Sequence, residues 1–169
     1  MFQKLRTDLA RKLKLIRLLM INADGLITES GISYYTRNSA LNDGHEIRAL
    51  KELGVEIVAF STKGSEEFYP IISRLGIESF HRAVSQKSVL YYRLKVKHSI
   101  SDDEIAFIGG DFSDLSIIER VSFPVATADA PLEVRSRSYY VTYGVGEEAV
   151  REVAKLILRA KNHSNGLSE

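Results

Sequence analysis

The chain contains no cysteine, which excludes disulfide bonds and thiolate chemistry. Its formal net charge is only +1 at pH 7, and this near-neutral balance gives no reason to expect a nucleic-acid partner. The four histidines are scattered along the chain, without the close spacing of a zinc site. The apolar runs are too short to span a bilayer, so we expect no membrane partner.

What the chain does have is the composition of an ordinary soluble protein. Of its 169 residues, 44% are hydrophobic and 27% are charged, which is enough apolar material for one core. We expect a cytoplasmic protein with an amphipathic helix at residues 1–14, one domain at 15–161 and a flexible tail at 162–169. The basic N-terminal segment has two alternative interpretations, a signal peptide and a helix that touches a membrane surface. Arg17 argues against the signal peptide because it interrupts the apolar run.

Segments with strand patterns alternate with segments of helical periodicity. The expected strands are Leu15–Ile21, Val55–Phe60, Glu104–Ile108, Ser122–Thr127 and Tyr139–Thr142. The expected helices are Asp43–Leu53, Ser65–Leu75, Gln86–Val96, Phe112–Arg120 and Glu147–Lys161, with a helical turn at Pro131–Arg135. This alternation is typical of an α/β fold in which helices cover both faces of a parallel sheet. We also expect a small β-hairpin flap near Gly31–Tyr35.

Loops rich in polar residues follow three of the expected strands. They cover residues 22–28, 61–65 and 109–114. In open parallel sheets, ligands bind beyond the carboxyl ends of the strands. We therefore expect these three loops to form one functional site.

The motifs in these loops resemble those of one enzyme family. NADG at 22–25 ends the first strand, Ser61 follows the second, Lys87 opens a later helix, and GGDFSD occupies 109–114. ATADAPL at 126–132 and EEAVREVAKLIL at 147–158 extend the likeness. In this order they resemble the haloacid dehalogenase superfamily, and more narrowly its capless branch of 3-deoxy-D-manno-octulosonate 8-phosphate phosphatases and the phosphatase-like domain of acylneuraminate cytidylyltransferases. The resemblance implies a Rossmann-like fold and a sugar-phosphate phosphatase.

The resemblance assigns a role to each matching residue. Position 22 is that of the nucleophile, an aspartate in the family, and Asp24 is the general acid and base. Ser61 would hydrogen-bond the phosphoryl group, and Lys87 would offset its charge. In this chain position 22 is Asn22, and a neutral amide cannot form the usual acyl phosphate. Without the resemblance, Asn22 and Asp24 would be interpreted as turn formers after a strand.

The resemblance also implies Mg²⁺, held by the nucleophile, by the backbone carbonyl of Asp24 and by the fourth loop. Asp111 and Asp114 remain there as candidate metal ligands, but the first acid of the family pattern is replaced by Gly110. A hard cation prefers anionic oxygens, so the loss of two carboxylates predicts a sharp fall in Mg²⁺ affinity.

Three further residues are candidates for substrate binding. Asp43 and Arg151 match positions near the substrate in the resemblance, and Lys63 offers an extra anion contact near Ser61. Their alternatives are a helix N-cap for Asp43, a solvated helix residue for Arg151 and a loop charge for Lys63. The segment YGVGEE at 143–148 carries glutamates, which would repel an anionic sugar acid.

The favoured hypothesis is a degenerate phosphatase-like protein with little or no turnover. It would bind a phosphorylated sugar or phosphate through Lys87, Ser61 and backbone N–H groups. One alternative is an active Mg²⁺-dependent phosphatase, in which Asp111 becomes a metal ligand and Asp24 or water replaces the nucleophile. Another is a structural subunit of a homo-oligomer, because the branch commonly forms tetramers through the hairpin, here residues 27–37, and the last helix.

Overall fold

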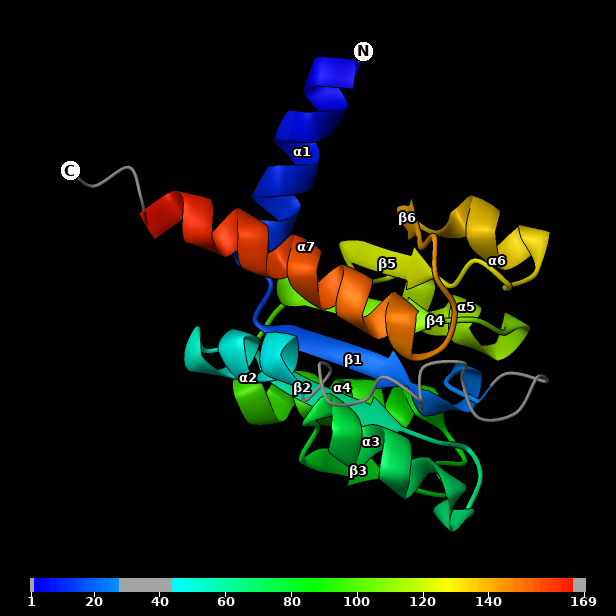
Figure 1. Cartoon of the computed structure of the whole chain (residues 1–169). Helices are drawn as coiled ribbons and strands as arrows, with labels where there is room; N and C mark the ends of the chain where they lie inside the picture. The colour runs from blue at the N-terminus through cyan, green and yellow to red at the C-terminus, as the bar shows by residue number, and fades with distance from the viewer. Residues whose placement is uncertain (1, 28–43, 166–169) are drawn as a thin grey trace.

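The computed structural model describes residues 2–27 and 44–165, and six strands of this part form one parallel sheet (Figure 1). The spatial order is β3-β2-β1-β4-β5-β6, so the first strand lies in the middle of the sheet. The strands are β1 (Leu18–Asn22), β2 (Glu56–Phe60), β3 (Ser79–His81), β4 (Ile105–Gly109), β5 (Phe123–Ala126) and β6 (Tyr140–Val141). The predicted hairpin and Asp43 lie outside the described residues.

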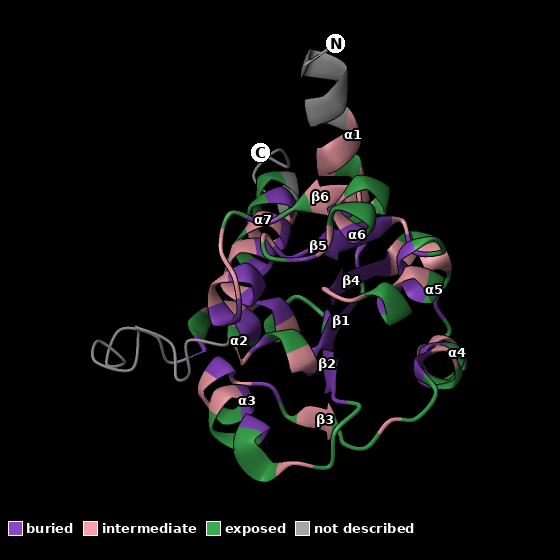
Figure 2. Ribbon diagram, turned by 90° about the vertical axis from the view of Figure 1, so that its right-hand side faces the viewer, coloured by how far each residue is buried: buried purple, intermediate pink, exposed green. Residues whose placement is uncertain are grey.

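Helices cover both faces of the sheet, which confirms the predicted α/β architecture (Figure 2). One face is packed by α1 (Phe2–Leu15), α2 (His45–Glu52), α3 (Tyr69–Leu75) and α7 (Glu147–Asn165). The other is packed by α4 (Lys87–His98), α5 (Leu115–Ile118) and α6 (Leu132–Arg137). Short 3-10 turns join these elements, at η1 (Ala23–Gly25), η4 (Glu66–Phe68), η5 (Asp102–Glu104) and η6 (Phe112–Asp114).

The first four residues of the central strand β1 are apolar, and both faces of the strand are buried. Leu19 and Ile21 join the core beneath α2 and α7, whereas Leu18 and Met20 join the core beneath α4 and α5. The alternation follows from the two-residue period of a strand. Burying each of these side chains contributes about 1.5–3 kcal/mol, so β1 is anchored from both sides.

The structure differs from the sequence predictions at several places. Helix α2 has Gly44 as its N-cap, with φ +74°, so the prediction of Asp43 at that position is wrong by one residue. The edge strand β3 was not predicted. Helix α7 continues to Asn165, so the segment from 162 to 165, predicted as part of a flexible tail, is helical. Among the helices of the described part, none is long and apolar enough to cross a bilayer.

Candidate functional site

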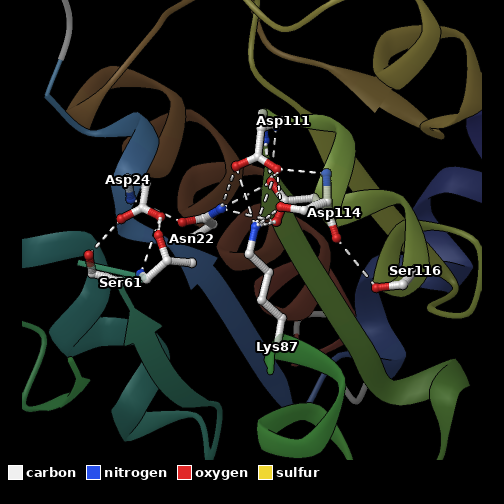
Figure 3. A network of polar contacts seen from close by, with 10 residues as sticks. Asn22, Asp24, Ser61, Lys87, Asp111, Asp114 and Ser116 are labelled. Carbon is white, nitrogen blue, oxygen red and sulfur yellow. Dashed lines mark hydrogen bonds and ion pairs between the residues drawn. The ribbon is translucent and has the colours of Figure 1, made fainter. Parts of the chain in front are cut away.

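The three predicted loops meet at the carboxyl edge of the sheet. Asn22, the last residue of β1, lies in register with Phe60, the last residue of β2, so Ser61, which follows β2, comes next to the NADG turn. On its other side β1 pairs with β4, which ends at Gly109. Figure 3 shows the side chains of these loops together with Lys87, which reaches in from the first residue of α4.

The Asn22 amide is held in one orientation. Its Oδ1 accepts a hydrogen bond from the backbone N–H of Asp24 at 3.0 Å. Its Nδ2 donates to the two carboxylate oxygens of Asp114, at 3.0 and 3.1 Å, and lies 3.5 Å from Asp111 Oδ2. The opposite orientation would set Oδ1 against a carboxylate, so the hydrogen bonds fix which end of the amide faces the acids.

Asp114 is fully buried and is surrounded by donors. Besides the Asn22 amide, its carboxylate accepts from Lys87 Nζ at 2.7 Å and from the backbone N–H groups of Gly110 and Asp111 at 2.9 and 3.1 Å. A carboxylate offers about four lone-pair positions, and these contacts use them. Asp114 therefore accepts hydrogen bonds from within the protein, including two from the backbone of its own loop, residues 109–114.

Lys87 is only 7% exposed, and its ammonium group bridges the acids of the fourth loop. In addition to Asp114, Nζ donates to Ser113 Oγ at 2.5 Å and lies 3.3 Å from both carboxylate oxygens of Asp111. Burial raises the pKa of Asp111, but the hydrogen bonds from Ser113 and the charge of Lys87 outweigh burial, so the pKa lies below its ordinary value.

Asp24 faces the second loop. Its carboxylate accepts from Ser61 Oγ at 2.6 Å, from Thr62 Oγ1 at 2.6 Å and from the Thr62 backbone N–H at 3.2 Å. Ser61 Oγ also accepts from the backbone N–H of Lys63 at 3.0 Å, which fixes the loop. Asp24 and Ser61, assigned to one site from the sequence, are therefore in direct contact.

A cavity of about 160 Å³ opens between these loops. Its lining residues are Asn22, Asp24, Gly25, Gly110, Asp111, Thr127 and Asp129. Typical small-molecule pockets measure about 300–1,000 Å³, so the part formed by the described residues suits a phosphate-sized group. Three acids, Asp24, Asp111 and Asp129, line the cavity, and the buried ammonium group of Lys87 offsets only part of their charge. The net charge around the cavity is therefore negative.

The residues present do not fit the Mg²⁺ ion that the resemblance implies. The two positions that would supply its carboxylates hold an amide and a glycine, Asn22 and Gly110. Asp114 has its lone pairs occupied by N–H donors, which leaves Asp111 as the acid of the fourth loop that reaches the cavity. Across residues 2–27 and 44–165, no three histidine, aspartate or glutamate side chains are grouped so that they could hold a metal ion.

Two of the predicted substrate-binding residues, Lys63 and Arg151, do not line this cavity. Lys63 is an exposed residue of the second loop. Arg151 lines a separate cavity of about 490 Å³ along α7, where Nη2 donates to Glu147 at 3.2 Å. Glu147 is itself paired with Arg74, so the negative charge expected of YGVGEE is partly offset within the chain. The roles of Lys63, Arg151 and Asp43 in substrate binding stay predictions.

Four residues of the site were not singled out from the sequence. Thr62 holds Asp24, and Ser113 holds both Lys87 and Asp111. Thr127 and Asp129 line the cavity from the loop after β5. The signal for Thr62 was its place next to Ser61. The signal for Thr127 and Asp129 was the ATADAPL segment, to which the sequence analysis gave no role.

Comparisons of the sequence with known proteins identify relatives of this chain. No model of a protein family matches the sequence. The 3-deoxy-D-manno-octulosonate 8-phosphate phosphatase of Salmonella typhi is 30% identical over 162 residues, which cover 92% of this chain and 86% of the relative. The same enzyme from Escherichia coli K12 is 29% identical, with 91% and 85% covered.

Solved structures of such phosphatases have the same fold. The Moraxella catarrhalis enzyme, in complex with a magnesium ion, a phosphate ion and KDO, has a TM-score of 0.77 at 26% identity, with 95% of each chain covered. The Yersinia pestis enzyme has a TM-score of 0.77 at 27% identity, with 94% of this chain and 89% of that chain covered. The chain therefore belongs to the 3-deoxy-D-manno-octulosonate 8-phosphate phosphatase family of the haloacid dehalogenase superfamily.

Proposed function

We propose that this chain is a degenerate phosphatase-like protein, which binds a phosphorylated sugar or phosphate and turns it over slowly or not at all. The observation that carries the proposal is the Asn22 amide, with its nitrogen directed at Asp114 and its oxygen bound to the Asp24 N–H. Neither end of this group is a nucleophile that could form an acyl phosphate.

The phosphoryl group would also lack electrostatic stabilisation. Transfer of a phosphoryl group develops negative charge, which positioned cations and hydrogen-bond donors normally stabilise. Here the ammonium group of Lys87 is already shared by Asp111, Asp114 and Ser113. The donor set therefore stabilises the chain's own acids rather than an incoming charge.

Ligand binding at this cavity is expected to be weak and independent of metal. The support for a phosphorylated sugar comes from the relatives, which are phosphatases of 3-deoxy-D-manno-octulosonate 8-phosphate. Against tight binding, Ser61 Oγ donates to Asp24, and the Lys87 protons are directed at acids. A phosphate must displace an internal acceptor for each hydrogen bond that it gains from these groups.

The second candidate is an active Mg²⁺-dependent phosphatase. It is favoured by the relatives, which are phosphatases, and by Asp111, whose side chain is 49% exposed at the cavity. This function requires Asp111 to turn away from Lys87 and bind a cation. It also requires water, activated by Asp24, to attack phosphorus in place of the missing carboxylate.

One assay separates the two candidates. Phosphate release from 3-deoxy-D-manno-octulosonate 8-phosphate is measured with magnesium for the native chain, for Asn22→Asp, for Gly110→Asp and for the double variant. We expect release by the double variant alone. A Cβ at Gly110 would lie 3.0 Å from Thr127 Oγ1, so the double variant is also made with Thr127→Ala. Turnover by the native chain that is abolished by Asp24→Ala would reject the degenerate function and support the active enzyme.

The third hypothesis, a structural subunit of a homotetramer, stays a prediction. One of the two segments that it invokes, residues 27–37, lies almost wholly outside the described residues. Size-exclusion chromatography with light scattering tests it, and a monomer would reject it.

A further inference from the structure

A second cavity lies beside the edge strand of the sheet, between β3 and α4. Its volume is about 620 Å³, within the range of about 300–1,000 Å³ that is typical of small-molecule sites. Residues 80–86 line it from the strand and the following loop, and Val89, Leu90 and Arg93 line it from α4. None of these residues lines the cavity around Asn22, so the two cavities are separate sites.

The charged side chains of this cavity are both arginines. Arg82 belongs to the loop and Arg93 to the helix, and no acid is found among the described residues that line the cavity. His81, at the end of β3, adds an imidazole whose N–H can donate a hydrogen bond. The cavity around Asn22 has the opposite character, because three acids line it. An anion in the second cavity would be attracted by both guanidinium groups.

Most of the hydrogen-bond donors of this cavity are available to a ligand. Within residues 2–27 and 44–165, the Arg93 side chain has no ion-pair or hydrogen-bond partner. Gln86, the N-cap of α4, makes no side-chain capping hydrogen bond. Arg82 lies over the Tyr69 ring, 5.0 Å from its centroid, and spends one donor on the Gly64 carbonyl at 3.4 Å. Because a guanidinium group carries five N–H donors, Arg82 is positioned by these contacts without being used up.

The loop that carries Arg82 has a fixed shape. Ala83 has φ +52°, a left-handed conformation that costs a residue with a Cβ about 1–2 kcal/mol. Two hydrogen bonds to the second loop hold this turn, from the Ala83 N–H to the Lys63 carbonyl at 3.0 Å and from the Val84 N–H to the Ser61 carbonyl at 2.9 Å. Strained backbone persists only where its surroundings hold it. The wall of the cavity is therefore formed before a ligand arrives.

We propose that this cavity binds an organic phosphate of about nucleotide size. Guanidinium groups bind phosphate oxygens through paired hydrogen bonds, which suits Arg82 and Arg93 to the phosphate end. Phe80, Val84 and Val89 supply an apolar wall for the rest of the molecule, and Val89 is 38% exposed in the absence of a ligand. The proposal goes beyond the proposed function, because it assigns a ligand to residues that take no part in phosphoryl chemistry.

The test is calorimetric titration of ADP into the full chain, with EDTA present and at about 0.15 M salt, where long-range attraction is screened. We expect saturable binding to the native chain. Arg93→Gln should weaken it about tenfold or more, because a hydrogen bond to a charged group is lost. Adenosine should give no binding heat, and pyrophosphate should bind about tenfold more weakly than ADP, because it has no apolar part to bury.

A matched control and a second measurement locate the binding. Lys97 is an exposed residue of α4 that does not line the cavity, so Lys97→Gln should bind ADP as the native chain does. The Tm of Arg93→Gln should equal that of the native chain, since Arg93 has no partner to lose. In NMR spectra, ADP should shift the backbone amide signals of residues 82–86 and leave those of 22–25 and 109–111 unchanged.

Three results would overturn the proposal. They are no ADP binding by the native chain, equal weakening by Arg93→Gln and Lys97→Gln, and amide shifts confined to residues 22–25 and 109–111. The first two leave the proposed function standing, because a different cavity carries it. The third would assign ADP to the cavity around Asn22 and so support binding there.

Discussion

Lys87 Nζ lies 2.7 Å from Asp114 Oδ1, and the two side chains are 7% and 0% exposed. The same ammonium group lies 3.3 Å from Asp111 Oδ1. One buried lysine thus balances two acids of the fourth loop and links that loop to the start of α4.

Replacing Lys87 with methionine keeps the length of the side chain and removes its charge. Two carboxylates are then left without their cation, and removing one partner of a buried ion pair costs about 3–5 kcal/mol. We expect the free energy of unfolding, measured with urea, to fall by about that amount. The control is Lys97→Met on the exposed side of α4, which should change the stability by less than about 0.5 kcal/mol. Equal losses for both variants would contradict a central role for Lys87.

The contact between Ser61 and Asp24 predicts a smaller loss. Ser61→Ala removes a buried hydroxyl that donates to Asp24 and accepts from the Lys63 N–H. We expect a loss of about 1–2 kcal/mol, since Asp24 keeps two hydrogen bonds from Thr62. A double-mutant cycle with Thr62→Val should show coupling between the two positions. Strict additivity would argue against a shared carboxylate acceptor.

The lowered pKa of Asp111 predicts a contribution to acid sensitivity. A carboxyl whose pKa is lower in the folded than in the unfolded chain stabilises the fold above its unfolded pKa, and this contribution is lost as the pH falls through its folded pKa. The free energy of unfolding of Asp111→Asn should therefore fall less steeply with acidification below about pH 4 than that of the native chain. Asp8 and Glu104 act in the same direction and Asp102 in the opposite one, but these groups are common to both proteins. Parallel pH profiles would contradict the prediction.

A second buried charge cluster, away from the cavity, provides an independent prediction. Glu147 is 6% exposed and is paired with Arg74 and with Arg151, the latter 3.2 Å away. Glu147→Ala leaves two guanidinium groups without their acid, so we expect a loss of about 3 kcal/mol in urea unfolding. Glu78→Ala, which removes the exposed partner of Lys51, serves as the control and should cost less than about 1 kcal/mol. A loss no larger than that of the control would show that the buried cluster is not important for stability.

The sequence was sufficient to predict the four inner strands of the sheet, β2, β1, β4 and β5, because these strands are buried on both faces. The apolar runs at β1 and β2 are local signals, and each strand was predicted correctly to within a few residues. The strand β1 begins at Leu18 rather than at Leu15 because helix α1 extends through Leu15, which is half exposed, and hydrophobicity alone does not separate the two elements.

The edge strand β3 could not be predicted for a physical reason. Its three residues are half-buried or exposed, so they carry no apolar run, and their pairing with Val58–Phe60 is set by the neighbouring strand. The helical state of residues 162–165 was missed because their polar composition is also typical of loose tails. In the structure, these residues continue helix α7, which begins at Glu147.

For the site, the sequence indicated the residues but not their partners. The order of the motifs brought Asn22, Asp24, Ser61, Lys87 and the fourth loop together, as the structure has them. The direction of the Asn22 amide depends on how Asp114 is fixed by the N–H groups of its own loop, and no local pattern encodes that contact. The same holds for Ser61, predicted to face a phosphoryl group, whose hydroxyl donates to Asp24.

The account depends on the absence of a cation site at this edge of the sheet, and a crystal grown with Mn²⁺ as an anomalous scatterer tests it most directly. We predict that the Asn22 Nδ2–Asp114 contact is kept and that the cavity lined by Asn22 and Asp111 shows no anomalous peak. A well-occupied octahedral ion there, within about 2.2 Å of an Asp111 carboxylate oxygen, would contradict the account.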